Sequence, residues 1–274
     1  MHWRLIIHDG ANGAWNMAVD EALLWSVAWG QSPPVIRLYA WASPTLSLGY
    51  FTTATHLARA CSELELAVVR RLSGGGIVLH DCEVTYAVIV PQGMVPNASS
   101  VLNSFRWLSR GILMGLQQLG IEATFATDAR MTRHERPREN RLNKCGFCFA
   151  SSSPTDIVVN GKKLVGGAQA RRRGVILQHG SVPIRWNCDI LSRLDGRIIM
   201  SGSNALFTSL EELLPSPLMV SEIRDALIAG FADALNAPLV KSELSNWEMM
   251  HARLLLRNKY GSADWTWGRC QKHL

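Results

Sequence analysis

The chain has 274 residues, of which 47% are hydrophobic and 18% charged, and its formal net charge is +6. This composition excludes a disordered or fibrous protein and allows one large domain or two small ones. No segment approaches the run of about 18 apolar residues that a membrane helix needs, and the first residues show no signal-peptide core. Six scattered cysteines are typical of reduced thiols. We expect a cytoplasmic protein.

The first half of the chain predicts two helices with short strands between them. Residues 16–29 carry apolar side chains at helical spacing, with Asp20 and Glu21 exposed or facing a site. Ser100 begins a long amphipathic helix that Gly120 ends. Between these helices the pattern predicts strands at residues 35–39, 45–48, 68–72, 77–79 and 84–90.

A hairpin follows at residues 156–165. Asn160-Gly161 lies between two β-prone runs, and this is the strongest short hairpin signal, because both turn residues need a positive φ. A two-residue turn pairs Val158 with Lys163. Alternation then sends Lys162 and Lys163 to opposite faces, so at most one of them can serve a given pocket.

The remaining elements complete an α+β pattern. A second antiparallel pair is predicted around Arg173-Gly174, Ser221 can cap a helix that runs to Leu235, and residues 265–268 are a short tail. Ser245 and Glu248 form a capping box for a last helix that ends near Tyr260. Strands joined by hairpins, with helices set apart, predict an α+β fold with a mixed, largely antiparallel sheet flanked by helices.

Cys148 and Lys163 are the candidate catalytic pair. A thiol beside a lysine ammonium has a lowered pKa, and the thiolate is the reactive form. The alternative is a buried structural cysteine near a solvated lysine. Cys145-Gly-Phe-Cys148 is also a C-x-x-C motif, but it does not lie at a βα junction, and no second ligand pair supports a zinc site.

Two glycine-rich segments are candidates for substrate binding. In Arg71-Leu-Ser-Gly-Gly-Gly-Ile-Val-Leu-His80 the backbone can approach a ligand closely and Arg71 can clamp an anionic group. This segment is neither a Walker A loop nor a dinucleotide motif, and a tight turn is the alternative. The second segment, Gly166-Gly-Ala168, precedes His179, which is either a proton-transfer group or a structural histidine.

Residues 130–144 carry five Arg and one Lys against Glu135 and Glu139. One interpretation is a solvated surface loop. The other is a docking patch for an acidic protein, where charge complementarity raises the rate of association. Nucleic-acid binding is not supported, because no aromatic residue is interleaved with the basic ones and no DNA-binding motif accompanies them.

In this order the motifs resemble the lipoate/octanoate attachment family, which contains lipoate–protein ligases and octanoyltransferases and shares a catalytic fold with biotin–protein ligases. Cys148-Phe149 with Ser153 and Asp156 is most similar to the LipM-type octanoyltransferases. The resemblance implies one catalytic domain over residues 1–274, without a C-terminal accessory domain and without a metal. It also implies acyl- and substrate-binding roles for Arg71, Ser73, Gly74, Gly75, Gly76, His80, Gly166, Gly167, Ala168 and His179.

The activity that the resemblance implies is a two-step transfer without a cofactor. Cys148 takes octanoyl from acyl carrier protein as a thioester, assisted by Lys163, and passes it to a lysine of a lipoyl domain such as glycine cleavage protein H. The alternatives are an ATP- and Mg-dependent lipoate–protein ligase, which needs no cysteine, and a non-catalytic lipoyl-domain-binding protein. One departure from the family is Gly167, where relatives often have Ser.

Overall fold

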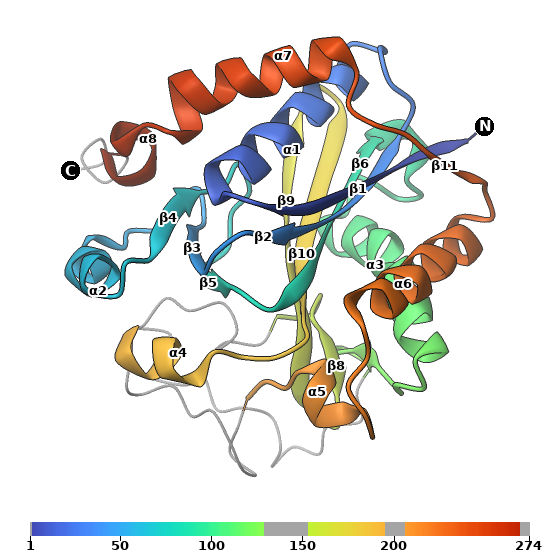
Figure 1. Ribbon diagram of the computed structural model, residues 1–274. Helices are drawn as coiled ribbons and strands as arrows, with labels where there is room; N and C mark the ends of the chain where they lie inside the picture. The colour runs from blue at the N-terminus through green and yellow to red at the C-terminus, as the bar shows by residue number, and fades with distance from the viewer. Residues whose placement is uncertain (1, 129–152, 195–205, 269–274) are drawn as a thin grey trace.

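The computed structural model describes residues 2–128, 153–194 and 206–268. Cys145, Cys148 and the basic segment 130–144 therefore lie outside the described residues. Two sheets organise the described part of the chain (Figure 1). The large sheet has eight strands, in the spatial order β11 (Leu239–Lys241), β1 (Trp3–Ala11), β2 (Val35–Trp41), β6 (Glu83–Pro91), β10 (Val175–Pro183), β9 (Lys162–Arg172), β8 (Ile157–Val159) and β7 (Thr124–Phe125).

The small sheet has the order β4 (Ala67–Arg70), β3 (Thr45–Leu48) and β5 (Ile77–His80). Eight α-helices surround the two sheets within the described ranges. They are α1 (Gly13–Ala28), α2 (Ala58–Glu63), α3 (Val101–Gln118), α4 (Cys188–Leu194), α5 (Leu210–Leu213), α6 (Val220–Leu235), α7 (Asn246–Leu255) and α8 (Ala263–Trp267). Short 3₁₀ turns at Thr55–Leu57 and Gln92–Met94 and a π-helical turn at Leu256–Tyr260 connect them.

The predicted mixed sheet flanked by helices is confirmed. Strands β2, β6, β10, β9, β8 and β7 pair antiparallel in that order, whereas β1 lies parallel to both β2 and β11. The sequence pattern missed β1 and β11, whose pairing joins residues more than 200 positions apart. It also treated residues 265–268 as a tail. They belong to α8 and the turn after it, and the carbonyls of Trp265 and Thr266 accept hydrogen bonds from buried Arg70.

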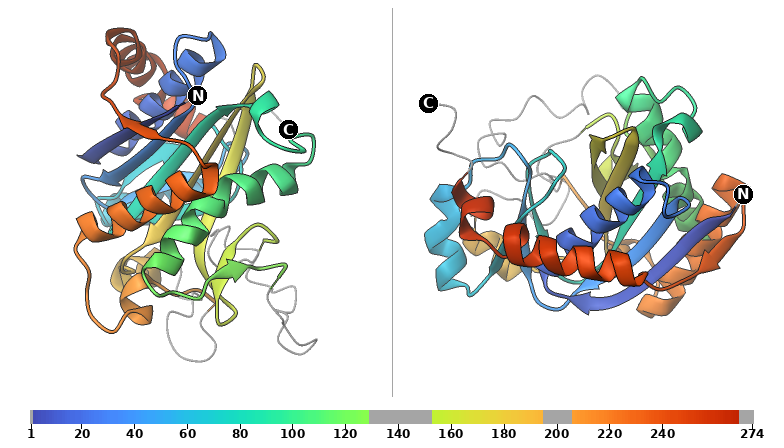
Figure 2. Two further views of the ribbon diagram at one scale, coloured as in Figure 1. Left: turned by 90° about the vertical axis from the view of Figure 1, so that its right-hand side faces the viewer. Right: turned by 90° about the horizontal axis from the view of Figure 1, so that it is seen from above.

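The large sheet is covered on both faces (Figures 1 and 2). Helices α3 and α6 pack on one face over a core that includes Leu108, Ile112 and Phe231. Helices α1 and α7 cover the other face, over a core that includes Leu23 and Leu177. The small sheet has its own apolar cluster with α2 and α4. None of the helices in the described ranges is both long and apolar enough to cross a membrane.

Local sequence signals place most helix ends and turns correctly. The Ser100 hydroxyl accepts from the Asn103 amide, and Gly120 has a φ of +76° after the end of α3. The predicted capping box joins Ser245 and Glu248 at the start of α7. Ser221 is not a cap, because α6 begins one residue before it and Glu222 accepts from the Met219 amide instead.

Both predicted hairpin turns are confirmed. Asn160 and Gly161 have φ values of 49° and 76°, and Arg173 and Gly174 have values of 50° and 74°. These left-handed pairs match the twist of the strands that they join. As predicted, Val158 pairs with Lys163.

Candidate active site

A partly open pocket lies between the large and small sheets. Its apolar lining comes from α1, β2 and β5, through Met17, Tyr39, Trp41 and Val78. Its polar lining comes mainly from Arg71, His80, Thr85, His179 and Ser181. The pocket is therefore an apolar space bordered by a few convergent polar groups, which is typical of a site for a small organic group.

The structure brings together six of the residues that the sequence singled out. Arg71, His80, Gly166, Gly167, Ala168 and His179 all line the pocket. Those on β9 and β10 meet because the two strands pair in a register that places Ala168 opposite His179 and Gly166 opposite Ser181. Cross-strand partners in such a pair share one face of the sheet.

The three consecutive glycines lie beside the pocket. The Arg71 guanidinium holds this loop by donating to the carbonyls of Gly74 (3.0 Å) and Gly76 (2.9 Å), and its expected role as a clamp for an anionic group stays a prediction. The guanidinium also donates to the Ser47 hydroxyl at 2.7 Å. Ser73, Gly74 and Gly76 thus contact the lining residues Arg71 and His179 from outside, and none of residues 73–76 lines the pocket itself.

His179 belongs to a buried chain of polar groups. Its Nε2 lies 2.5 Å from the Ser73 hydroxyl and its Nδ1 lies 3.2 Å from Asp20 Oδ2. The other oxygen of Asp20 accepts from Arg37 at 2.7 Å, and both side chains of that ion pair are almost completely buried. The Tyr39 hydroxyl also donates to Asp20, at 3.1 Å.

Burial and neighbouring charges act in opposite directions on the pKa values of Asp20 and His179. Burial favours the neutral form of Asp20, but Arg37 and His179 outweigh it and lower the pKa of the carboxyl. Burial also lowers the pKa of His179, against the effect of Asp20. His179 is therefore neutral near pH 7, with its proton on Nδ1 toward the carboxylate, and Nε2 accepts a hydrogen bond from Ser73.

A second chain of a serine, a histidine and a carboxylate also borders the pocket. The Ser47 hydroxyl lies 2.6 Å from His80 Nε2, and His80 Nδ1 lies 2.8 Å from Glu83. Burial raises the pKa of Glu83, but His80 and two hydroxyl donors outweigh it, so the net shift is downward. The Trp41 ring stacks on His80 at 4.0 Å between centroids. Both pocket histidines are thus held in fixed orientations by a carboxylate and a serine.

Of these supporting residues, the sequence singled out Ser73 as a binding residue and gave Asp20 as exposed or facing a site, whereas it missed Ser47, Arg37, Glu83 and the pocket's apolar lining. Asp20 is 1% exposed, and it faces the site through its contact with His179. Weak signals did exist: Asp20 interrupts an apolar helix, and Arg37 interrupts an apolar strand. A buried charge must be paired, so such interruptions indicate an internal ion pair.

Lys163 is buried and paired. It is 3% exposed, and its Nζ lies 2.9 Å from Asp156 Oδ2, which also accepts from the Ser153 amide at 2.6 Å. Burial raises the pKa of Asp156, and the neighbouring Lys163 opposes this shift. Lys162, by contrast, is half-buried.

A β-bulge decides which way Lys163 faces. Ile157 pairs with Val165 and Val158 with Lys163, so Leu164 is an extra residue in β9. Leu164 and Val165 both pack into the α3–α6 core, and Lys163 points to the opposite face. That is the face of Ala168 and the pocket, although Lys163 is not among the described residues that line it.

Gly167 has a physical reason for its departure from the family pattern. A Cβ atom at this position would lie 3.0 Å from the Phe105 ring, 3.1 Å from the His179 carbonyl and 3.2 Å from the Tyr86 hydroxyl. A serine here would crowd these groups, and they would have to move by a few tenths of an ångström to admit it.

No three His, Cys, Asp or Glu side chains of residues 2–128, 153–194 and 206–268 are placed to hold a metal ion. Among the described cysteines, Cys61 is buried, Cys82 is half-buried and Cys188 is exposed, and all three are free thiols. Burial raises the pKa of the Cys61 and Cys82 thiols, so neither is an activated nucleophile.

Comparison with known proteins gives a consistent result. Residues 12–232 match the family described as the lipoyl protein ligase A/B catalytic domain. The chain is 39% identical to octanoyltransferase LipM of Kyrpidia tusciae, over 97% of this chain and 98% of that protein. It is 37% identical to octanoyltransferase LipM of Bacillus subtilis, over the same shares of both chains.

Two solved structures with a similar fold are described as lipoate protein ligases. A putative lipoate protein ligase of T. acidophilum with bound lipoic acid superposes with a TM-score of 0.78, at 24% identity over 98% of this chain and all of that one. Lipoate-protein ligase A bound with ATP gives a TM-score of 0.76, at 23% identity over 97% and 98% of the two chains. At this identity the likeness establishes the fold alone.

Proposed function

Because the chain belongs to the lipoyl protein ligase A/B catalytic-domain family, we propose that it transfers octanoyl groups in protein lipoylation through a thioester on Cys148. The observation that carries the activity is its similarity, over nearly the whole length of both chains, to several octanoyltransferases. The acceptor is a lysine of a lipoyl domain. The donor is octanoyl-acyl carrier protein, and glycine cleavage protein H is the expected acceptor protein.

The chemistry takes two steps. The Cys148 thiolate attacks the carbonyl carbon of the donor thioester, a new C–S bond forms, the donor C–S bond breaks, and the donor sulfur leaves as a thiolate that takes up the proton given up by Cys148. The neutral amine of the acceptor lysine then attacks the carbonyl carbon of the acyl-enzyme, a C–N bond forms, the C–S bond to Cys148 breaks, the nitrogen loses a proton to solvent, and Cys148 leaves as the thiolate. A thioester is already activated, so neither step requires ATP.

The pocket suits the octanoyl chain. Met17, Tyr39, Trp41 and Val78 provide apolar surface, and the glycines of β9 allow close approach of the backbone. Burial of six methylene groups contributes about 5 kcal/mol, at about 0.8 kcal/mol for each. The ring nitrogens of His80 and His179 are each engaged by a serine and a carboxylate, so the two rings border the chain in fixed orientations.

Lys163 supplies positive charge on the pocket side of β9. Its ion pair with Asp156 holds the side chain in place, so the ammonium is preorganised. In the proposed mechanism it stabilises the thiolate of Cys148 and the negative charge that develops on the acyl carbonyl. The buried position strengthens both effects, because little water screens the charge.

Intact-mass spectrometry tests this mechanism. The protein is incubated with octanoyl-acyl carrier protein in the absence of ATP, and we expect an octanoyl adduct that is absent in Cys148→Ala. Cys188→Ala is the matched control, because Cys188 is an exposed free thiol outside the pocket, and this variant should keep the adduct. Acylation of a lipoyl domain that requires ATP and survives Cys148→Ala would identify a ligase instead. Binding without either reaction would identify a non-catalytic lipoyl-domain-binding protein.

A further inference from the structure

A short turn after β3 packs against the rim of the pocket. Gly75 is exposed, and its carbonyl accepts from the Thr52 hydroxyl at 2.8 Å. A Cβ atom on Gly75 would lie 3.3 Å from the Arg71 guanidinium and 3.8 Å from Ala168 Cβ, and both of these residues line the pocket. Residues 50–52 therefore lie at the edge of the site.

This turn carries the most exposed large apolar side chain of the described residues. Phe51 is 83% exposed and contacts the Tyr50 ring edge-to-face, at 4.8 Å between centroids. The Arg172 guanidinium lies 6.0 Å from the Tyr50 ring, and Arg172 and Arg173 are both exposed at the end of the β9–β10 hairpin. We call Tyr50, Phe51, Arg172 and Arg173 the rim patch.

The backbone beneath Phe51 is held rigidly. The Gly49 amide donates to Gly76 at 3.1 Å, and the Tyr50 amide donates to Ser73 at 2.8 Å. Buried Arg70 donates to the carbonyls of Gly49 (2.7 Å) and Thr52 (2.9 Å). A turn held in this way loses little backbone entropy when a partner binds, so Phe51 projects from a fixed position.

We propose that the rim patch is the docking surface for the lipoyl domain that accepts the acyl group, an inference that rests on the proposed function. A lysine side chain extends only about 6 Å from its backbone, so the domain that carries it must pack against the rim to reach the pocket. A carrier protein that delivers its acyl group on a long phosphopantetheine arm needs no such contact. Aromatic and arginine side chains dominate the energy of protein interfaces, and the two arginines favour an acidic partner.

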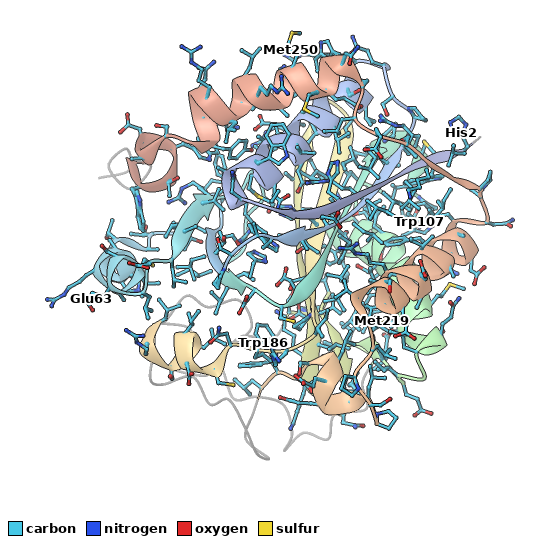
Figure 3. All side chains as sticks on the ribbon, viewed as in Figure 1. His2, Glu63, Trp107, Trp186, Met219 and Met250 are labelled. Atoms are coloured by element: carbon cyan, nitrogen blue, oxygen red, sulfur yellow. The ribbon has the colours of Figure 1, made fainter. Side chains whose placement is uncertain are left out.

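The test separates binding of the acceptor from the chemistry. In Phe51→Ala and in Arg172→Glu, we expect KM and Kd for the lipoyl domain to rise about fivefold or more. Acylation of the enzyme by the small donor S-octanoyl-N-acetylcysteamine should stay unchanged, as should release of the acyl group by hydroxylamine. Met250→Ala is the control, because Met250 is 56% exposed on the outer face of α7 (Figure 3) and should have no effect.

Three outcomes would overturn the docking surface. The first is an unchanged KM and Kd for the lipoyl domain in both variants. The second is an equal rise of this KM and Kd in Met250→Ala. The third is a rise confined to the KM for octanoyl-acyl carrier protein. Failure of the proposed function looks different, because wild-type protein would then bind the lipoyl domain without forming an acyl-enzyme. Kd is measured by calorimetry without turnover, so the docking surface is tested in that case too.

Discussion

Replacing Asp20 with Asn should destabilise the protein strongly and move the ring proton of His179 to its other nitrogen. Asp20 accepts hydrogen bonds from Arg37, Tyr39 and His179, and the exposed fractions of the Asp20 and Arg37 side chains are only 2% and 0%. An asparagine oxygen can still accept from Arg37. Its amide group then faces His179, so the ring must move its proton from Nδ1 to Nε2.

The expected magnitude follows from burial. Removing one partner of a buried ion pair costs about 3–5 kcal/mol, because the remaining charge is left in a low dielectric. In a chain of this size, a loss of that order lowers Tm by roughly 6–20 °C. The matched control is Glu63→Gln, which removes the ion pair with Arg59. The Glu63 side chain is 57% exposed and the Arg59 side chain is 91% exposed. An exposed pair of this kind contributes about 0.5 kcal/mol or less.

Urea unfolding at pH 7 measures the two losses of stability, and the ¹⁵N shifts of the imidazole report which nitrogen of His179 carries the proton. We expect the free energy of unfolding to fall several times more in Asp20→Asn than in Glu63→Gln. Equal losses in the two variants would refute the argument from burial. A His179 ring that keeps its proton on Nδ1 in Asp20→Asn would refute the assigned hydrogen-bond chain.

Three further predictions concern packing, catalysis and pH. Gly230→Ala should cost about 3 kcal/mol in thermal unfolding, because its Cβ would lie 2.2 Å from a backbone nitrogen of α3, whereas Gly93→Ala, with open space around it, should cost little. Lys163→Met should slow acyl-enzyme formation by about 100-fold or more in single-turnover mass spectrometry, whereas Lys162→Met should not. Burial and a neighbouring guanidinium lower the pKa of His8 to about 4, so folding favours its neutral form. Its contribution to stability is present above pH 6.5 and is lost as pH falls toward 4, so wild type should lose more stability between pH 7 and 5 than His8→Gln.

The sequence predicted the features that depend on neighbouring residues. Asn160-Gly161 fixed a hairpin because the turn needs two positive φ values, and the Ser245–Glu248 capping box fixed a helix start. The glycine motifs and their order indicated the family, and six of the predicted residues line one pocket. Cys148 lies outside the described residues, so its role stays a prediction.

Tertiary structure alone decided the features that depend on distant partners. Strand β1 pairs with β11, more than 200 residues away, and local patterns carry no signal for such a contact. Asp20 meets His179 across 159 positions, only because α1 packs on the sheet beside β10. Strict alternation of side chains along β9 would put Lys163 and Ala168 on opposite faces of the sheet. The bulge at Leu164 puts them on the same face. A single extra residue changes every later side-chain direction in a strand, so the register of the pairing, and not the spacing in the sequence, places the lysine on the pocket side.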